Sequence, residues 1–376
     1  MPTPAPASPP APARLASLDA LRGFDMFWIV GADAIGGAIG RLHAGPVGAT
    51  IAEQLDHVAW AGFRAYDLIF PLFVFMVGVA IPLSLSKYVA AGRPGDAVPR
   101  ILRRTALLFV LGLFYYGGLT HAFSDLRLMG VLQRIGLCYG AASLLFLYCR
   151  PRAVFAVIAG LLLGYWALLA FVPVPGFGAG DYAEGHNLTN WLDAHVLPFR
   201  KWDGDHDPEG LLSTLPAIAT CLLGVCAGRF LRESPLAGAA KAARLALAGV
   251  ALLALGYAWG LEFPVIKKLW TSSFVLVAGG WSFLLLAGFY YTIDVRDRRG
   301  WAQPFVWVGA NALTLYLVSN IVDFNALSAR LAGGPVAAAL DAVWTGLGGL
   351  ILALVGAALC ILLARFLYRR QIFLRL

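Results

Sequence analysis

Long apolar runs separated by short polar segments follow one another along most of the chain. The runs at 106–118, 153–172 and 348–367 each approach the roughly 20 residues that a helix needs to cross a lipid bilayer. Because the bilayer core offers the backbone no water, such segments must form helices rather than open sheets. The pattern therefore predicts an all-α fold and a polytopic integral membrane protein.

The same pattern predicts about ten transmembrane helices around a central polar cavity. No period of about 20–50 residues repeats along the chain. Residues 1–15 are rich in Pro and Ala, lack the basic start and apolar core of a cleavable signal, and predict a disordered tail. Residues 16–376 then form a single transmembrane domain. Its expected helices cover about 20–40, 67–87, 102–119, 128–148, 153–173, 210–231, 243–260, 270–292, 304–324 and 340–365.

Composition agrees with a membrane protein and argues against a redox framework. Only 13% of the 376 residues are charged, against roughly 25% in a soluble domain. The five cysteines lie in or next to apolar runs and form no CxxC pair. Buried free thiols are therefore expected.

The basic residues are divided unevenly between the two sides of the predicted membrane. If the connections alternate in side, 20 of the 29 Lys and Arg share one side with both chain ends. The positive-inside rule places that side, and both termini, in the cytoplasm. The net charge of +8 then belongs mostly to cytoplasmic loops near acidic lipid headgroups, and it requires no nucleic-acid partner.

One stretch on the predicted outer side combines ionisable residues with an apolar helix start. Residues 51–65 place apolar side chains at helical spacing, which predicts a short amphipathic surface helix. His57 lies within it, and Asp67 is expected to cap the transmembrane helix that follows. A lone histidine there is usually a solvated surface residue, but His57 has Trp60, Asp67 and, by topology, Asp33 as neighbours.

Several predicted spans carry polar side chains, which in a membrane usually face a cavity or a partner. On the first span Arg22 and Asp25 are spaced for an ion pair, and Asp33 lies on the same face. A purely structural pair is the simpler interpretation of the first two. Later spans contribute Arg134, Ser272 and Asn311, either to a common interior or to interhelical hydrogen bonds.

The outer side also carries one long loop, at about 174–209, rich in Asp, Glu, His, Trp and Tyr. Loops of this length are usually functional or disordered, and the tryptophans argue against disorder. Aromatic and carboxylate side chains suit a sugar, although an interfacial belt of tryptophans is the alternative. The loop histidines show no metal-ligand spacing, so no metal is expected.

Six segments resemble, in the same order, the transmembrane N-acetyltransferases typified by lysosomal heparan-α-glucosaminide N-acetyltransferase. The resemblance covers nearly the whole chain from Ser17, but the family's large luminal domain and its preceding helix have no counterpart. It therefore implies a bare ten-helix catalytic unit. The segments are SLDALRGFD (17–25), HVAWAGFRAYDLIFPLFVFMVG (57–78), GVLQRIG (130–136), DPEGLLST (207–214), LWTSSF (269–274) and GANALTLYL (309–317).

The resemblance implies acetyl transfer across the membrane, from cytoplasmic acetyl-CoA to the amine of glucosamine or a terminal glucosamine residue outside. The family's catalytic histidine falls on His57, and a family asparagine tied to catalysis falls on Asp33. For a bacterial homologue the expected location is the inner membrane with the long loop periplasmic, and a homodimer is one assembly open to it. Candidate acceptor-binding residues are Trp60, Asp67, Trp202 and Glu209.

Acetyl-CoA is rich in phosphate, and phosphates favour arginine clusters, so cytoplasmic arginines are candidate ligands. Positive-inside topology alone is the alternative explanation for these charges. Polar residues within the spans complete the expected cofactor site. The candidates are Arg100, Arg103, Arg104, Arg134, Ser272, Asn311, Arg370 and Arg375.

Chemistry leaves the role of His57 open. An imidazole can take the proton that an ammonium must lose before it attacks a thioester, or it can accept the acetyl group itself. Two other functions are also kept as alternatives. One is a permease for glucosamine or N-acetylglucosamine, although neither inverted repeats nor matched broken helices are clear in the sequence. The other is O-acetylation of an envelope polysaccharide.

Overall fold

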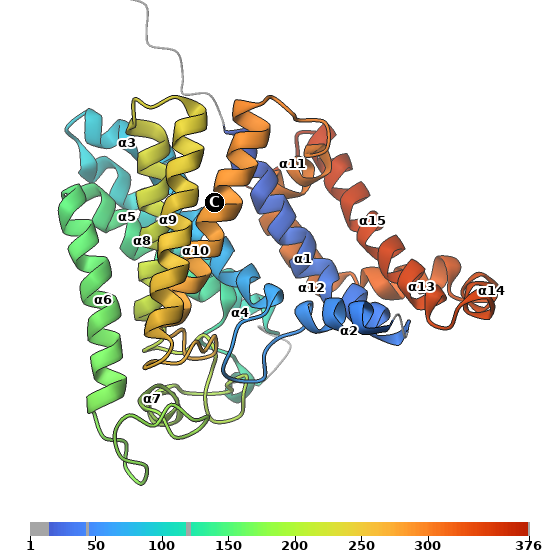
Figure 1. Ribbon diagram of the computed structural model, residues 1–376, viewed down its shortest axis with the longest axis horizontal. Helices are drawn as coiled ribbons and strands as arrows, with labels where there is room; N and C mark the ends of the chain where they lie inside the picture. The colour runs from blue at the N-terminus through green and yellow to red at the C-terminus, as the bar shows by residue number, and fades with distance from the viewer. Residues whose placement is uncertain (1–14, 43–44, 118–121, 375–376) are drawn as a thin grey trace, which may run out of the picture.

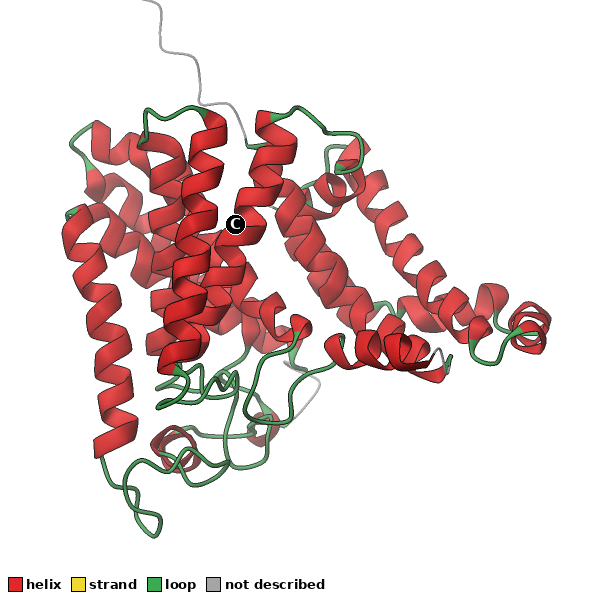
Figure 2. Cartoon of the chain, in the orientation of Figure 1, coloured by secondary structure: helices red, strands yellow, loops and turns green. Residues whose placement is uncertain are grey.

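A computed structural model describes residues 15–42, 45–117 and 122–374. The described residues are mostly helical and contain isolated β-bridges but no strand (Figure 2). Most of the predicted tail and Arg375 lie outside them. The longer helices are α1 (Ala16–Arg41), α3 (Ile69–Ala90), α4 (Val98–Tyr115), α5 (Val131–Tyr148), α6 (Pro151–Phe171), α8 (Thr214–Glu233), α9 (Gly238–Trp259), α10 (Ser272–Phe289) and α15 (Leu347–Arg369).

Short helices connect or extend these spans. The single turn η1 leads into α3, and the π-helical η5 continues α10. They are α2 (Gly45–Gln54), η1 (Ala65–Leu68), η2 (Pro94–Ala97), η4 (Phe123–Asp125), α7 (Leu188–Val196), η5 (Tyr290–Val295), α11 (Gln303–Ala310), α12 (Ala312–Ile321), α13 (Phe324–Ala332) and α14 (Pro335–Val343).

The all-α membrane architecture expected from the sequence is confirmed, whereas the count of ten spans is not. Among the described residues, seven helices are long and apolar enough to cross a bilayer. The number rises to eight if α11 and α12, which are bent by 76° at their break, count as one span. The expected spans at 20–40 and 102–119 correspond to α1 and α4, which lie outside this set and carry several charged side chains.

Helices α3, α5, α8 and α10 form the buried centre, with α6 and α9 on its outside (Figure 1). Glycines allow the closest approaches. A Cβ on Gly78 of α3 would overlap the carbonyl oxygen of Cys221 in α8, and one on Gly224 would overlap that of Phe75. Lipid tails are as apolar as helix side chains, so the hydrophobic effect does not drive membrane helices together. Close backbone packing of this kind holds them together instead.

A second close contact attaches α1 to the α11–α12 pair. A Cβ on Gly23 would overlap the carbonyl oxygen of Phe305, and one on Gly309 would overlap that of Asp19. This contact fixes the rotation of α1 about its axis. Within α1, Arg22 lies 3.5 Å from Asp19, whereas the carboxylate of Asp25 is buried without a hydrogen-bond partner among the described residues. The expected Arg22–Asp25 pair is therefore wrong.

The segment around His57 differs from the sequence prediction. The helix expected over 51–65 is replaced by α2, which ends at Gln54, and by an irregular stretch from 55 to 64. Gly62 has φ +124, and its N–H donates to the carbonyl of Val265 over 2.8 Å. A glycine at positive φ, paired with a distant loop, is incompatible with a helix that continues to residue 65. The spacing of apolar residues along the sequence could not predict this hydrogen bond between distant segments.

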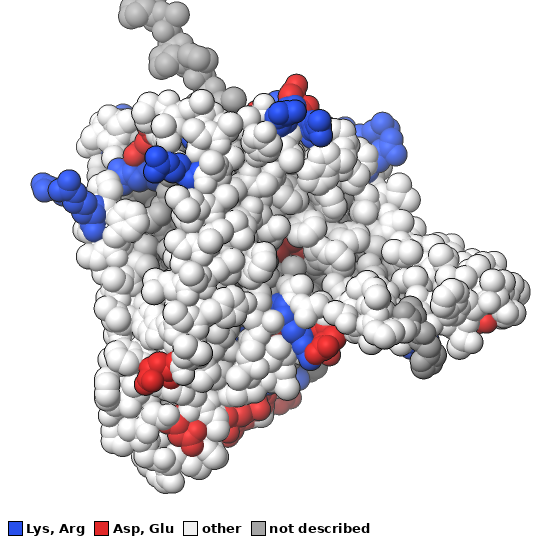
Figure 3. Space-filling model, viewed as in Figure 1, with Lys and Arg blue, Asp and Glu red and all other residues white. Residues whose placement is uncertain are grey.

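The long connection between α6 and α8, residues 172–213, is named the outer connection after its predicted side. It lies at the same end of the molecule as α2 and the start of α3 (Figure 1). It is ordered by α7, whose N-cap Asn187 accepts a hydrogen bond from the N–H of Asn190 over 3.0 Å. Acidic side chains gather mainly at this end, and basic ones mainly at the opposite end (Figure 3). The assignment of the two ends to outside and cytoplasm remains a prediction.

Candidate active site at the outer end of α3

His57 lies against the start of α3, where a buried carboxylate holds its ring. Its Nδ1 is 2.8 Å from Oδ1 of Asp67, and the Asp67 side chain is wholly buried. The other Asp67 oxygen accepts from the N–H groups of Arg64, over 3.0 Å, and Val58, over 3.4 Å. A carboxylate at Nδ1 keeps the proton there, so Nε2 presents its lone pair.

Asp67 therefore has two roles. It caps the start of the helix, as expected, through the N–H of Arg64. It also orients His57, whereas the sequence prediction placed it in acceptor binding. His57 and Asp67 are ten positions apart, and most of the residues between them belong to the irregular stretch, so helical spacing gave no sign of the contact.

Tyr66 connects His57 to Asp33. The Tyr66 ring stacks on the His57 imidazole with centroids 4.5 Å apart and planes 15° apart. Its hydroxyl is hydrogen-bonded to the Asp33 carboxylate on α1. The predicted neighbourhood of His57 and Asp33 thus exists, but Asp33 reaches the imidazole through Tyr66, and Asp67 is the carboxylate that holds Nδ1.

Lys267 is the component that sequence reasoning missed. Its Nζ lies 3.0 Å from Nδ1 and 3.1 Å from Nε2 of His57, and 3.5 Å from Oδ1 of Asp67. Burial lowers the pKa of this lysine, and nearby carboxylates, Asp67 first among them, oppose that shift. The sequence did contain one indication of it. Lys267 and Lys268 are adjacent lysines on the predicted outer side, where lysine and arginine are otherwise few.

A buried ion-pair group lies beside this cluster. Arg127 binds both oxygens of Asp207, over 2.8 and 2.6 Å, and also contacts Glu209. Its guanidinium carbon lies 4.4 Å from the ring centroid of Tyr116 and 4.9 Å from that of Trp202. Burial raises the pKa of Glu209. The two candidate acceptor-binding residues Trp202 and Glu209 thus meet at one arginine.

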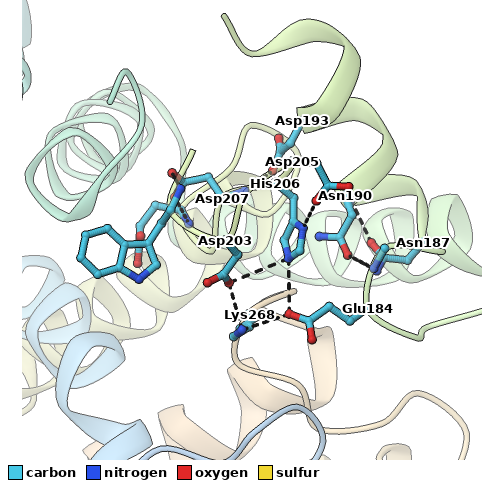
Figure 4. A network of polar contacts seen from close by, with 12 residues as sticks. Glu184, Asn187, Asn190, Asp193, Asp203, Asp205, His206, Asp207 and Lys268 are labelled. Carbon is cyan, nitrogen blue, oxygen red and sulfur yellow. Dashed lines mark hydrogen bonds and ion pairs between the residues drawn. The ribbon is translucent and has the colours of Figure 1, made fainter. Parts of the chain in front are cut away.

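Trp60 fastens the irregular stretch to the long outer connection. Its indole N–H donates to the carbonyl of Tyr182 over 2.9 Å, and Lys268 Nζ lies 5.9 Å from its ring centroid. The neighbouring network joins Lys268 to Glu184, over 3.0 Å, and to Asp203, over 2.9 Å (Figure 4).

That network also contains the ligand types of a metal site. Glu184, Asp203 and His206 come close enough together to hold an ion, and they are the only such group found among the described residues. His206 Nδ1 is 2.7 Å from Asp205, and its Nε2 faces Glu184 at 3.5 Å (Figure 4). The Lys268 ammonium forms an ion pair with both carboxylates. The expectation of no metal stays a prediction.

A cavity of about 370 Å³ extends from the opposite end of the molecule toward this cluster. Arg22, Arg100 and Arg104 lie in its wall, and most of the rest of the lining is apolar. Along α3 the wall runs from Ser84 to Phe70, 14 residues apart, which corresponds to about 21 Å of helix. The predicted central cavity is present, with its charge concentrated in arginines and its wall more apolar than expected.

The candidate cofactor residues divide into two groups relative to this cavity. Arg100 and Arg104 line it, and the Arg104 guanidinium lies 4.5 Å from the Tyr139 ring centroid. Arg103 and Arg370 are exposed and are not part of its lining. Arg375 lies outside the described residues.

Three further candidates are buried in helix contacts away from the cavity wall. Arg134 donates to the carbonyl of Gly210 over 3.2 Å and to the hydroxyl of Ser213. Ser272 donates to the carbonyl of Leu162 over 2.7 Å, which is an interhelical bond between α10 and α6. Asn311 occupies the break between α11 and α12. A role of these residues in cofactor binding stays a prediction.

Comparison with known proteins identifies one family and two curated proteins with similar sequences. Residues 14–178 match a family described as a domain of unknown function (DUF5009). The chain is 27% identical over 423 aligned residues to human heparan-alpha-glucosaminide N-acetyltransferase, covering 96% of this chain and 60% of that protein. It is 26% identical to the mouse protein of the same name, covering 84% of this chain and 56% of that protein.

The resemblance expected from the sequence is confirmed. The relationship is distant but extends over most of this chain. The chain spans 56–60% of the length of these two curated relatives. What the relatives do is therefore a basis for proposing a function of this protein.

Proposed function

We propose that this protein transfers an acetyl group from acetyl-CoA, bound at the arginine end of the cavity, to the amine of an amino sugar at the His57 end. One observation carries the proposal. The cavity wall reaches Phe70, which is one helical turn beyond Asp67 on the continuous η1–α3 segment. A donor entering from one face and an acceptor entering from the other therefore meet at a single point.

The cavity matches the parts of acetyl-CoA in order. Arginines at its mouth suit phosphates, which bind guanidinium groups through charge-assisted hydrogen bonds. The apolar stretch of about 21 Å suits an extended pantetheine arm. The thioester then arrives near Phe70, where apolar surroundings keep water from hydrolysing it.

The His57 cluster supplies the chemistry at the other end. With Nδ1 held by Asp67, Nε2 is free to act in either of two schemes. As a base it takes the proton of the sugar amine while the amine attacks the thioester carbonyl. As a nucleophile it takes the acetyl group first and passes it to the amine. In both schemes the C–S bond breaks and the CoA thiolate leaves, taking up a proton.

The acceptor side of the site contains carboxylates and aromatic rings. Glu209 and Asp67 face the buried ammonium of Lys267, and Trp202 lies over Arg127 at the surface of the outer connection. Stacking on an aromatic ring and hydrogen bonds to carboxylates suit a glucosamine. The cytoplasmic position of both termini and a periplasmic position of the outer connection, in a bacterial inner membrane, belong to the same proposal.

One observation favours the permease alternative. The α11–α12 pair is broken at Asn311 with a bend of 76°, and broken helices at mid-membrane are a feature of transporters. A permease would not need a histidine held by a buried carboxylate, nor arginines around the opposite end of the cavity. The enzyme is therefore the better-supported function.

The deciding experiment uses purified protein in detergent with acetyl-CoA and glucosamine. We expect release of free CoA, detected with a thiol reagent, and formation of N-acetylglucosamine, detected by mass spectrometry. N-acetylglucosamine as acceptor is the control, because its amine is blocked while its hydroxyls remain. CoA release with both sugars supports O-acetylation instead. No CoA release, with sugar uptake into proteoliposomes, supports a permease.

A further inference from the structure

The ammonium of Lys267 lies over one face of the His57 imidazole. Its Nζ is almost equally far from the two ring nitrogens, 3.0 and 3.1 Å. Those nitrogens flank the Cε1 carbon, so a point in the ring plane at these distances would overlap Cε1. The ammonium must therefore lie out of the ring plane, against a face of the imidazole, and the Tyr66 ring also stacks on the imidazole.

Backbone contacts hold Lys267 in this position. The segment before it pairs with the His57 segment through a β-bridge between Ala61 and Ile266. After it, Trp270 adopts φ +53 and donates its N–H to the carbonyl of Lys267 over 2.9 Å. A bulky residue in the left-handed region is strained and persists only where the surroundings impose it. The fold thus accepts a strained turn that delivers Lys267 to the imidazole.

The charges around Lys267 oppose the loss of its proton that burial favours. The carboxylates of Asp67, Glu209 and Asp33 all act on it, and Asp67 lies within 3.5 Å. The adjacent Lys268 is directed elsewhere, to Glu184 and Asp203 in the outer connection (Figure 4). Of these two neighbouring lysines, Lys267 thus contacts the imidazole and Lys268 belongs to the loop network.

We propose that Lys267 is a catalytic residue that stabilises the oxyanion of the tetrahedral intermediate. The role rests on the proposed acetyl transfer but not on the choice between its two schemes. In each, a nitrogen at or beside His57 Nε2 bonds to the thioester carbon, and the carbonyl electrons move onto oxygen. That oxygen develops its charge next to Nζ, which is 3.1 Å from Nε2. The electrons return as the C–S bond breaks, and the lysine keeps its proton.

The test compares Lys267→Met, Lys267→Arg and Lys268→Met in the full-length protein. Removing one preorganised oxyanion partner lowers kcat about 10²- to 10³-fold. We expect this loss in Lys267→Met with the KM for acetyl-CoA unchanged, since that ligand is held at the far end of the cavity. Lys267→Arg keeps the charge and should retain more activity. Lys268→Met should stay within about threefold of the parent.

A second measurement does not depend on acetyl-CoA turnover. Diethyl pyrocarbonate is attacked by a neutral imidazole nitrogen through the same kind of tetrahedral oxyanion, and it leaves a carbethoxy group on the ring. The rate at His57, followed by peptide mass spectrometry, should fall in Lys267→Met and not in Lys268→Met. This readout tests Lys267 even if the parental protein fails to acetylate glucosamine, an outcome that would remove the proposed function.

Three results would overturn the inference. One is a normal kcat in Lys267→Met. Another is an equal loss in Lys268→Met, which would indicate a general effect of disturbing this loop. The last is an unchanged rate of His57 modification in Lys267→Met.

Discussion

The His57 imidazole and the Asp67 carboxylate meet across 2.8 Å at the point where α3 begins, and the carboxylate is wholly buried while the histidine is half exposed. The buried partner is fixed by two backbone N–H groups, and the exposed one faces the acceptor side. This is the division expected of a catalytic pair, in which one group orients and the other reacts.

Asp67→Asn should therefore damage catalysis more than folding. The amide can still accept from the backbone, but it presents an N–H to Nδ1 as readily as an oxygen and so favours the wrong tautomer of His57. We expect kcat to fall on the order of 10²- to 10⁴-fold with unchanged acetyl-CoA affinity. Steady-state kinetics with calorimetric binding would check this.

Glu53→Gln, which alters a neighbouring surface carboxylate paired with Arg64, is the control and should stay near the parental rate. A fully active Asp67→Asn would reduce Asp67 to a helix cap.

The arginine end of the cavity gives the second prediction. Arg104→Ala should weaken acetyl-CoA binding about 10- to 150-fold, since a hydrogen bond to a charged group contributes roughly 1.5–3 kcal/mol. Glucosamine affinity should hardly change. The matched control is Arg152→Ala, an exposed arginine in the first turn of α6 that is not part of the cavity lining. Equal losses of acetyl-CoA affinity in the two variants would indicate that Arg104 contributes only to membrane topology.

The sequence was sufficient for the architecture because hydrophobic runs report directly on helices in lipid. It also identified the neighbourhood of His57 with Asp33, which follows from alternating topology once the spans are placed. It was insufficient for contacts that depend on the rotation and register of packed helices. Lys267 meets His57 across 210 positions. Arg127 meets Asp207 across 80 positions. No periodic pattern encodes either pair.

The error at residues 51–65 has a similar cause. Apolar spacing favoured a continuous helix, but Gly62 adopts a positive φ and its N–H bonds to Val265, so a helix cannot continue to residue 65. In α1, helical spacing allowed Arg22 to pair with a carboxylate on either side along the helix, and it lies 3.5 Å from Asp19. Local spacing restricts the possible partners but does not select among them.

Asp193 in the outer connection provides a prediction about pH and stability. Burial raises its pKa to about 6, although the N–H of Leu211 donates to it over 3.0 Å. The folded state thus holds this proton at a pH where the unfolded chain, with a pKa of 3.8, has released it. Stability from this group is present below pH 4 and is lost as pH rises through 6.

Asp193→Asn should remove that loss, which is on the order of 3 kcal/mol for a shift of about two pKa units. We expect the variant's thermal unfolding midpoint to vary less between pH 4 and 7 than that of the parent. Glu262→Gln, at an exposed loop carboxylate, is the control and should keep the parental dependence. The same pH dependence in parent and Asp193→Asn would contradict the assignment.

Sidedness is open to a direct test. In a background without the five native cysteines, Ala179→Cys in the outer connection should react with a membrane-impermeant maleimide added to intact cells. Gly95→Cys, in the turn between α3 and α4, should react only after lysis. Both positions are exposed, so accessibility of the side chain itself is matched. Labelling of Gly95→Cys in intact cells would reverse the orientation, and with it the side from which acetyl-CoA enters.

The last prediction separates His57 from Asp33. His57 presents Nε2 to the reacting groups, so His57→Ala should lower the rate by about 10²- to 10⁴-fold as a lost base, and by more as a lost nucleophile, while acetyl-CoA still binds. No direct contact joins Asp33 to the imidazole among the described residues, and its link to the ring is the hydrogen bond with the Tyr66 hydroxyl. An amide oxygen can still accept that hydrogen bond, so Asp33→Asn should be mild and Asp33→Ala more severe. Tyr66→Phe removes the same hydrogen bond from the other side and should resemble Asp33→Ala.

The measurement is glucosamine acetylation by all four variants, with acetyl-CoA binding as the control for folding. An inactive Asp33→Asn beside an active His57→Ala would make Asp33 the base. Parental rates in both would mean that the chemistry takes place elsewhere.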